Sequence, residues 1–186
     1  MTSQKIKSSF FVLFIVALTL FIAGNYIISR KNEELMRASF FFPVYLNSYI
    51  PVISLADAQG RVVTENDLKN GVYILHFWAT WCRSCEQELF GISKIQNKNL
   101  RIMCISVDEE PSNAVKFLEE RNLNLPLFFD KEGKAAKAFG TLKYPETYIV
   151  RDGQVIIKFE GPRDWGDENL IEFILNTAGL IRDYNR

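Results

Sequence analysis

The chain has 186 residues, enough for one domain of ordinary size and an appendage. Hydrophobic residues make up 48% of it, which suffices for a buried core, and its formal net charge at pH 7 is zero. Because nucleic-acid-binding proteins carry an excess of positive charge, no nucleic-acid partner is expected.

The N-terminal segment is the first predicted element. Residues 8–29 carry no charged side chain and include an almost wholly apolar run from Phe10 to Ala23. About 20 apolar residues cross a bilayer as a helix, so residues 1–30 are predicted to form an N-terminal transmembrane anchor. The alternative is a cleaved signal peptide, whose apolar core is shorter and ends at an A-x-A site that is not clear here. Basic residues flank both ends, so the positive-inside rule does not decide the orientation.

Residues 31–50 are predicted to form a juxtamembrane linker. They are rich in aromatic side chains, which favour the membrane–water interface. Two interpretations stay open: the linker rests on the membrane, or it packs on the following domain as a strand or helix. The aromatic residues are Phe40, Phe41, Phe42, Tyr45 and Tyr49.

The globular domain is predicted to begin near Pro51 with a hairpin, a helical turn and a buried strand. Residues 52–55 and 61–63 flank the turn sequence A-Q-G, which favours a hairpin. Residues 64–68 suit one helical turn. The apolar run 72–79 is too continuous for a half-exposed strand, so it is expected to be buried on both faces.

Two cysteines with two residues between them, Cys82 and Cys85, follow this strand and begin a helix-compatible stretch. A C-x-x-C between a strand and a helix is typical of a redox-active dithiol. The first helical turn has unpaired N–H groups and the positive end of the helix dipole, so a thiolate there is stabilised. Cys82 is therefore predicted to lie exposed at the N-cap as the nucleophile. Cys85 is predicted to be more buried and able to close a disulfide onto Cys82.

A structural zinc site is the alternative explanation of such a pair, and the number of ligands argues against it. Zinc needs four ligands, commonly two such pairs or one pair with histidines, whereas the chain has three cysteines and one histidine. Cys104 lies in an apolar, strand-like run and is expected in the core. No metal or other cofactor is therefore expected.

The remaining elements alternate between strands and helices, which indicates the α/β class with a central mixed sheet. Pro111 suits the first turn of a helix, and Asp152-Gly153 is a strong hairpin signal. Strands are expected over 101–107, 127–129, 147–150 and 155–159, and helices from 111, over 135–139 and from 167.

Several motifs resemble one family. F-W-A-T-W-C-R-S-C, residues 77–85, is similar to the active site of thioredoxin-like proteins. Three further features resemble the membrane-anchored TlpA/ResA/DsbE type of thiol–disulfide oxidoreductase. These are Glu88 three residues after the second cysteine, the P-E-T-Y-I-V run over 145–150, and the L-A-D…Q-G-R…D-L pattern over 55–68. The resemblance covers roughly residues 51–178.

The resemblance implies a thioredoxin fold over residues 51–186, a central mixed sheet flanked by helices, with the TlpA-like helix–strand insertion over 111–127. It implies a cis peptide bond before Pro145, and substrate contacts by Trp81, Tyr144 and Pro145. The enzyme would reduce protein disulfides on the periplasmic or extracytoplasmic side of the bacterial inner membrane. Apocytochrome c is a leading candidate substrate, and a transmembrane thiol donor would re-reduce the enzyme.

Resolution of a mixed disulfide requires Cys85 to lose its proton, and two residues are candidates for the acceptor. Glu88 follows Cys85 at helical spacing and matches the family position. His76 lies in the apolar strand six residues before Cys82, where thioredoxin itself carries a buried aspartate. The alternatives are a solvated helical glutamate and a core histidine with one hydrogen bond.

Two other functions would require different motifs around the cysteines. A copper metallochaperone of the Sco kind requires C-x-x-x-C and a distal histidine, whereas this chain has C-x-x-C and His76 upstream. A peroxiredoxin requires P-x-x-x-T-x-x-C, and the corresponding positions before Cys82 hold Leu75 and Ala79. The sequence therefore favours a dithiol oxidoreductase.

Overall fold

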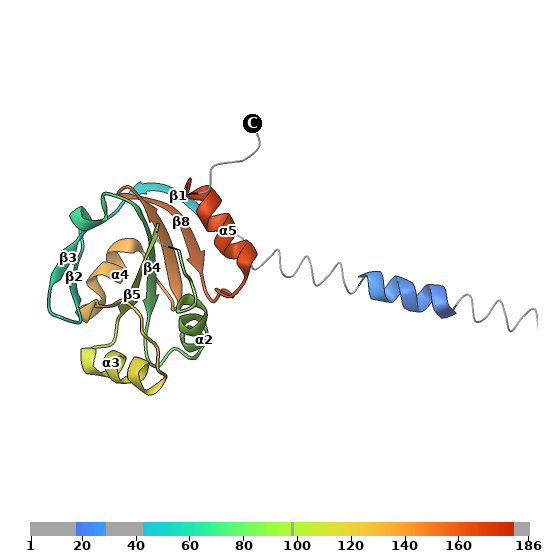
Figure 1. The fold of residues 1–186 in the computed structure, drawn as a ribbon, viewed down its shortest axis with the longest axis horizontal. Helices are drawn as coiled ribbons and strands as arrows, with labels where there is room; N and C mark the ends of the chain where they lie inside the picture. Colours follow the sequence, from blue (N-terminus) through green and yellow to red (C-terminus); the bar gives the residue numbers. More distant parts are fainter. Residues whose placement is uncertain (1–17, 29–42, 98, 181–186) are drawn as a thin grey trace, which may run out of the picture. The chain divides into compact units, whose positions relative to one another are not determined.

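The computed structural model describes residues 18–28, 43–97 and 99–180 (Figure 1). The chain divides into two compact units, Met1–Phe42 and Pro43–Arg186. In the first unit, residues 18–28 are helical. Within the described part of the chain, no helix has both the length and the apolar character needed to cross a membrane. The remainder of the predicted anchor, and residues 31–42 of the predicted linker, lie outside the described residues.

The second unit contains an eight-stranded mixed sheet in the order β1-β8-β7-β4-β5-β6-β2-β3 (Figure 1). The strands are β1 (Val44–Tyr49), β2 (Ser54–Asp57), β3 (Val62–Thr64), β4 (Val72–Trp78), β5 (Leu100–Ser106), β6 (Leu127–Phe129), β7 (Glu146–Arg151) and β8 (Gln154–Glu160). The helices are η1 (Glu65–Leu68), α2 (Arg83–Ile92), α3 (Pro111–Glu120), η2 (Lys131–Gly133), α4 (Lys134–Phe139) and α5 (Glu168–Thr177). The thioredoxin-like α/β fold is thus confirmed.

Strand β4 is the central element that carries the site. It pairs in parallel with β5 and antiparallel with β7, and all seven of its residues are buried. Leu75 and Phe77 belong to one hydrophobic core, which includes Ala135 and Ala136 of α4. Because side chains alternate along a strand, His76 lies on the opposite face. There it contacts Glu88 of α2.

The ends of several elements follow from the residue types found there. Pro111 occupies the first turn of α3, where its missing N–H costs nothing. Gly140 ends α4 in the left-handed conformation that glycine adopts without strain. Asp167 caps α5 by accepting the Asn169 N–H. The predicted hairpin at Asp152-Gly153 joins β7 to β8.

The start of the domain differs from the prediction near Pro51. Strand β1 pairs antiparallel with β8 at the edge of the sheet, so the compact unit begins at Pro43. Most β1 side chains are exposed, so the strand is held mainly by backbone hydrogen bonds. Its side chains therefore lack the hydrophobic pattern from which a strand is predicted. For residues 44–49 the structure shows the second interpretation, a strand packed on the domain.

Candidate active site

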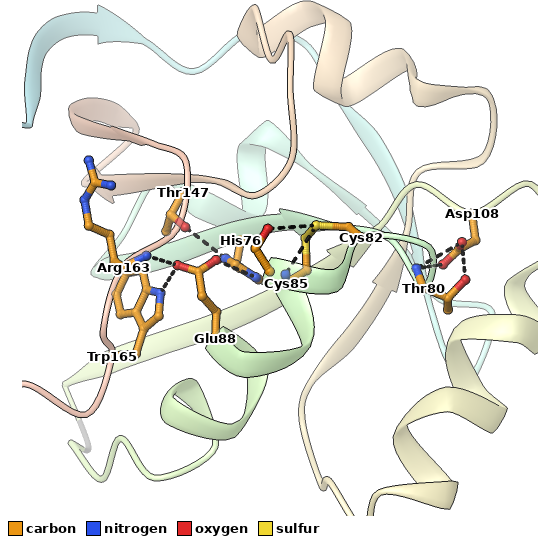
Figure 2. Close-up of a disulfide and its surroundings, with 10 residues drawn as sticks. His76, Thr80, Cys82, Cys85, Glu88, Asp108, Thr147, Arg163 and Trp165 are labelled. Atoms are coloured by element: carbon orange, nitrogen blue, oxygen red, sulfur yellow. Dashed lines mark hydrogen bonds and ion pairs between the residues drawn. A yellow bond between two sulfur atoms is a disulfide. The ribbon is translucent and has the colours of Figure 1, made fainter. Parts of the chain in front are cut away.

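A disulfide joins Cys82 and Cys85 at the N-terminus of α2 (Figure 2). Cys82 is the N-cap, as predicted, and its Sγ accepts a hydrogen bond from the Cys85 N–H at 3.3 Å. Cys85 is completely buried, whereas Cys82 keeps 7% of its surface exposed. The predicted order of exposure holds, but Cys82 is more covered than expected. Its sulfur is bonded to Cys85, and the Ser84 hydroxyl lies 3.6 Å away.

The loop that precedes Cys82 is held in place by a buried carboxylate. Asp108 follows β5 and accepts hydrogen bonds from the backbone N–H and the hydroxyl of Thr80. It also accepts the Ser106 hydroxyl at 2.8 Å. Because Asp108 is only 5% exposed, these bonds face little competition from water. They hold the chain two residues before Cys82.

The three residues expected to contact a substrate lie together beside the loop. The rings of Trp81 and Tyr144 meet edge to face at 5.7 Å, and Trp81 is 69% exposed. The Tyr144–Pro145 peptide bond is cis, as the resemblance implies. An exposed aromatic surface therefore adjoins the C-x-x-C loop, although more than sixty residues separate its members in sequence.

Glu88 is buried one turn below Cys85 on α2, so it is not a solvated helical glutamate. One carboxylate oxygen, Oε1, accepts the Arg163 backbone N–H at 2.6 Å and the Trp165 indole N–H at 2.7 Å (Figure 2). Burial raises the pKa of Glu88 to about 7, and the two N–H donors oppose that rise. A carboxyl with this pKa can take up or release a proton near neutral pH.

His76 lies against Glu88, so the two candidate proton carriers are neighbours. His76 Nδ1 is 2.9 Å from the Thr147 hydroxyl, and Nε2 is 3.9 Å from the second oxygen of Glu88, Oε2 (Figure 2). The imidazole is completely buried, and burial lowers its pKa to about 3. The histidine is therefore neutral in the physiological pH range.

Several residues in these contacts were not named as candidate site residues from the sequence, among them Asp108, Thr147, Arg163 and Trp165. The 161–166 segment has turn composition, G-P-R-D-W-G, and a lone tryptophan in such a stretch is its one available signal. Arg163 donates its backbone N–H to Glu88, a contact that any residue except proline could make, and its positive charge also acts on the Glu88 carboxyl. Cys104 is buried and free, as expected for a core residue, and burial raises the pKa of its thiol.

Comparison with known proteins gives one family match, to the AhpC/TSA family over residues 46–159. The thiol–disulfide oxidoreductase ResA of Bacillus thuringiensis is 28% identical over 129 residues, covering 67% of this chain and 73% of ResA. The thioredoxin-like protein YneN of Bacillus subtilis is 30% identical and covers 57% of this chain and 65% of YneN. A DsbE-type thiol:disulfide interchange protein of Chlorobium tepidum superimposes with a TM-score of 0.64 and 27% identity. The match covers 72% of this chain and 97% of the Chlorobium chain.

Leu75 and Ala79 stand where the peroxiredoxin motif requires proline and threonine, and ResA is a thiol–disulfide oxidoreductase by name. The fold, the disulfide and these similarities agree. The chain belongs to the AhpC/TSA family, as a thioredoxin-like thiol–disulfide oxidoreductase of the TlpA/ResA/DsbE type.

Proposed function

We propose that this enzyme is anchored in the bacterial inner membrane and reduces protein disulfides outside the cytoplasm, with apocytochrome c as a leading substrate. The observation that carries the proposal is the Cys82–Cys85 disulfide at a helix N-terminus, beside the exposed Trp81 ring and the half-buried Tyr144 ring. The anchor is supported by the apolar run of residues 10–23.

The structure holds the oxidised state, so the catalytic cycle begins with reduction of the disulfide by a thiol donor. Two thiols of the donor are oxidised to a disulfide, and Cys82 and Cys85 receive two electrons and two protons. The Cys82 thiolate then attacks a substrate disulfide, forms a mixed disulfide and releases one substrate thiol. Cys85 loses its proton and attacks Cys82, which restores the enzyme disulfide and releases the second substrate thiol.

In this cycle Cys82 is the nucleophile and Cys85 the resolving thiol. The Cys85 N–H that points at Cys82 Sγ would stabilise the thiolate. Glu88 would receive the proton of Cys85, because it lies one turn along the same buried helix face. Trp81, Tyr144 and Pro145 would bind the substrate strand.

Cysteine variants test the redox roles. Cys82→Ser is expected to abolish reduction of insulin, and Cys85→Ser to accumulate mixed disulfides through Cys82. Trapping is read by non-reducing electrophoresis, with Cys104→Ser as the matched control that should behave like wild type. Full activity of Cys85→Ser, or mixed disulfides through Cys85 rather than Cys82, would contradict the assignment.

The substrate class needs a separate comparison. An oxidised peptide carrying C-x-x-C-H, the haem-attachment motif of c-type cytochromes, is expected to be reduced faster than a scrambled peptide with the same disulfide spacing. Trp81→Ala should slow the first peptide toward the rate of the second. Equal rates for both peptides with the wild-type enzyme would remove apocytochrome c from the proposal and leave a general protein-disulfide reductase.

Topology is tested by fusing alkaline phosphatase after Arg186, because that enzyme needs its own disulfides and is inactive in the reducing cytoplasm. An active, membrane-bound fusion is the expected result. A stable, full-length but inactive fusion would place the domain in the cytoplasm. A fusion released from washed membranes would argue against the anchor.

A further inference from the structure

Two buried polar atoms face each other across the His76–Glu88 contact. Among the described residues, neither His76 Nε2 nor Glu88 Oε2 makes a hydrogen bond, and 3.9 Å separates the two. Every other polar atom of the two side chains is occupied: Nδ1 by Thr147, and Oε1 by Arg163 and Trp165. Since unpaired buried polar atoms are costly, the contact is most favourable in protonation states in which one of the two facing atoms can donate to the other.

Complementarity depends on protons, and only certain states provide it. If Glu88 is ionised, Nε2 must carry the imidazole proton. If Glu88 is protonated, its hydroxyl can point at a bare Nε2, and the imidazole proton then belongs on Nδ1. An ionised carboxylate opposite a bare Nε2 would place two lone pairs against each other.

Thr147 allows the imidazole to change between these two forms. Its hydroxyl lies 2.9 Å from His76 Nδ1 and can either donate to a bare Nδ1 or accept from a protonated one. Thr147 is 2% exposed, so its hydroxyl, rather than solvent water, is the partner of Nδ1. The ring can therefore switch tautomer without losing the hydrogen bond on its far side.

We propose that His76 and Glu88 hold a single exchangeable proton, and that His76 switches tautomer each time Glu88 gains or loses it. His76 is then a positioning residue that acts through Glu88, and the two residues are one unit rather than rival proton carriers. This inference rests on the proposed function, in which the proton comes from the Cys85 thiol and leaves when the enzyme is reduced again.

The other groups around the pair do not compete for this role. Arg163 of the 161–166 segment is the positive charge acting on Glu88, and its Nη1 is engaged by backbone carbonyls of residues 160–162. On the strand side, Cys104 of β5 pairs in register with His76, and burial raises its pKa. Cys85 is bonded in the disulfide. The raised pKa of Glu88 and the lowered pKa of His76 agree with a proton that rests on the carboxyl below neutral pH.

The single histidine of the chain makes the test direct. The oxidised full-length protein, labelled with ¹⁵N only in histidine and purified in detergent without a histidine tag, is titrated from pH 5 to 9 by NMR. The imidazole is expected to stay neutral and to pass from the Nδ1–H form to the Nε2–H form with a midpoint near pH 7. Glu88→Gln should abolish the switch, and Glu86→Gln, on the same helix, should leave it unchanged.

An imidazolium signal within this range, or one tautomer at all pH values in the wild-type protein, would overturn the inference. Kinetics supply a second readout. His76→Leu removes the Nε2–H that faces Oε2 when Glu88 is ionised, so the ionised carboxylate is less stable. The pH midpoint of mixed-disulfide release should therefore rise by one unit or more. An unchanged midpoint would also overturn it. Insulin reduction reports separately on the proposed function, because the tautomer switch is read in the resting protein without turnover.

Discussion

Trp165 donates its indole N–H to Glu88 Oε1 at 2.7 Å, across 77 residues of sequence. The bond joins the loop before α5 to the helix that carries the cysteines. A donor to a buried carboxylate stabilises the ionised form and so lowers the carboxyl pKa. The C-terminal part of the domain therefore adjusts the acidity of a group next to the disulfide.

Trp165→Phe is expected to raise the pKa of Glu88 above about 7, because one of the two donors to Oε1 is removed. The midpoint of the pH profile for mixed-disulfide release should move upward. Trp78→Phe is the matched control, since Trp78 is also buried but its Nε1 has no hydrogen-bond partner among the described residues. A midpoint that moves equally in both variants would assign the effect to packing.

Glu88 and His76 are expected to affect stability with opposite pH dependence. Glu88 has its pKa raised from 4.5 to about 7, so its protonated form favours folding and that contribution is lost as pH rises between these values. His76 has its pKa lowered from 6.5 to about 3, so its contribution is lost as pH falls below 6.5. Between pH 4.5 and 6.5 the two slopes cancel in the wild-type protein.

Removing one partner should expose the slope of the other, about 1.4 kcal/mol per pH unit. Relative to wild type, His76→Leu should be more stable at pH 5 than at pH 6.5, and Glu88→Gln less stable at pH 5 than at pH 6.5. Urea unfolding at the two pH values measures both. Slopes of the same sign in the two variants would be inconsistent with the proton assignments.

The close contact with Trp165 is predicted to require glycine at position 91 of α2, so that Gly91 cannot be replaced without cost. A Cβ at this position would lie 2.8 Å from the Trp165 Cβ and 3.2 Å from its carbonyl carbon, so the backbone of the loop would have to move. Gly91→Ala should therefore destabilise the protein by about 1–3 kcal/mol, although alanine favours helix by about 1 kcal/mol. Urea unfolding measures the change, and the exposed Gln87→Ala on the same helix is the control. A Gly91→Ala protein as stable as wild type would show that the loop carrying Trp165 can move away without loss of stability.

Asp108→Ala should destabilise the domain by about 1–3 kcal/mol, because the partly buried Thr80 N–H and the buried Ser106 hydroxyl lose their acceptor. Asp108→Asn keeps one acceptor oxygen and should give a smaller loss. The neighbouring Glu109→Ala is exposed and should change stability by less than about 0.5 kcal/mol. Thermal unfolding of the three variants gives the comparison, and equal losses for Asp108→Ala and Glu109→Ala would contradict it.

Cys104 should be chemically silent in the folded protein. Its side chain is completely buried, and burial raises the pKa of its thiol, so the reactive thiolate is disfavoured. Ellman's reagent is expected to detect no thiol in the native oxidised enzyme and one thiol after denaturation. Cys104→Ala should reduce insulin at the wild-type rate. A thiol that titrates rapidly in the native protein would disprove the core assignment.

Local sequence patterns predicted most of the fold because each depends on near neighbours. The buried strand in the apolar run 72–79, the Asp152-Gly153 turn, the helix ending at residue 139 and the helix with Asp167 at its N-terminus all lie where predicted. Strand β1 was not predicted, because it is held by backbone hydrogen bonds to β8 and has few buried side chains. An edge strand of this kind is visible only once its partner is in place.

The sequence alone determined the redox pair, its helix-terminal position and the aromatic and proline residues beside it, since C-x-x-C spacing and family motifs are local signals. It also named Glu88 and His76, but only as alternatives. Tertiary structure decided that they are neighbours, because β4 and α2 bring their side chains together within a buried layer. It likewise supplied Trp165, Arg163 and Thr147 as partners from distant segments. Burial of the carboxyl and imidazole, which shifts both pKa values, arises from long-range packing and has no signature in the local sequence.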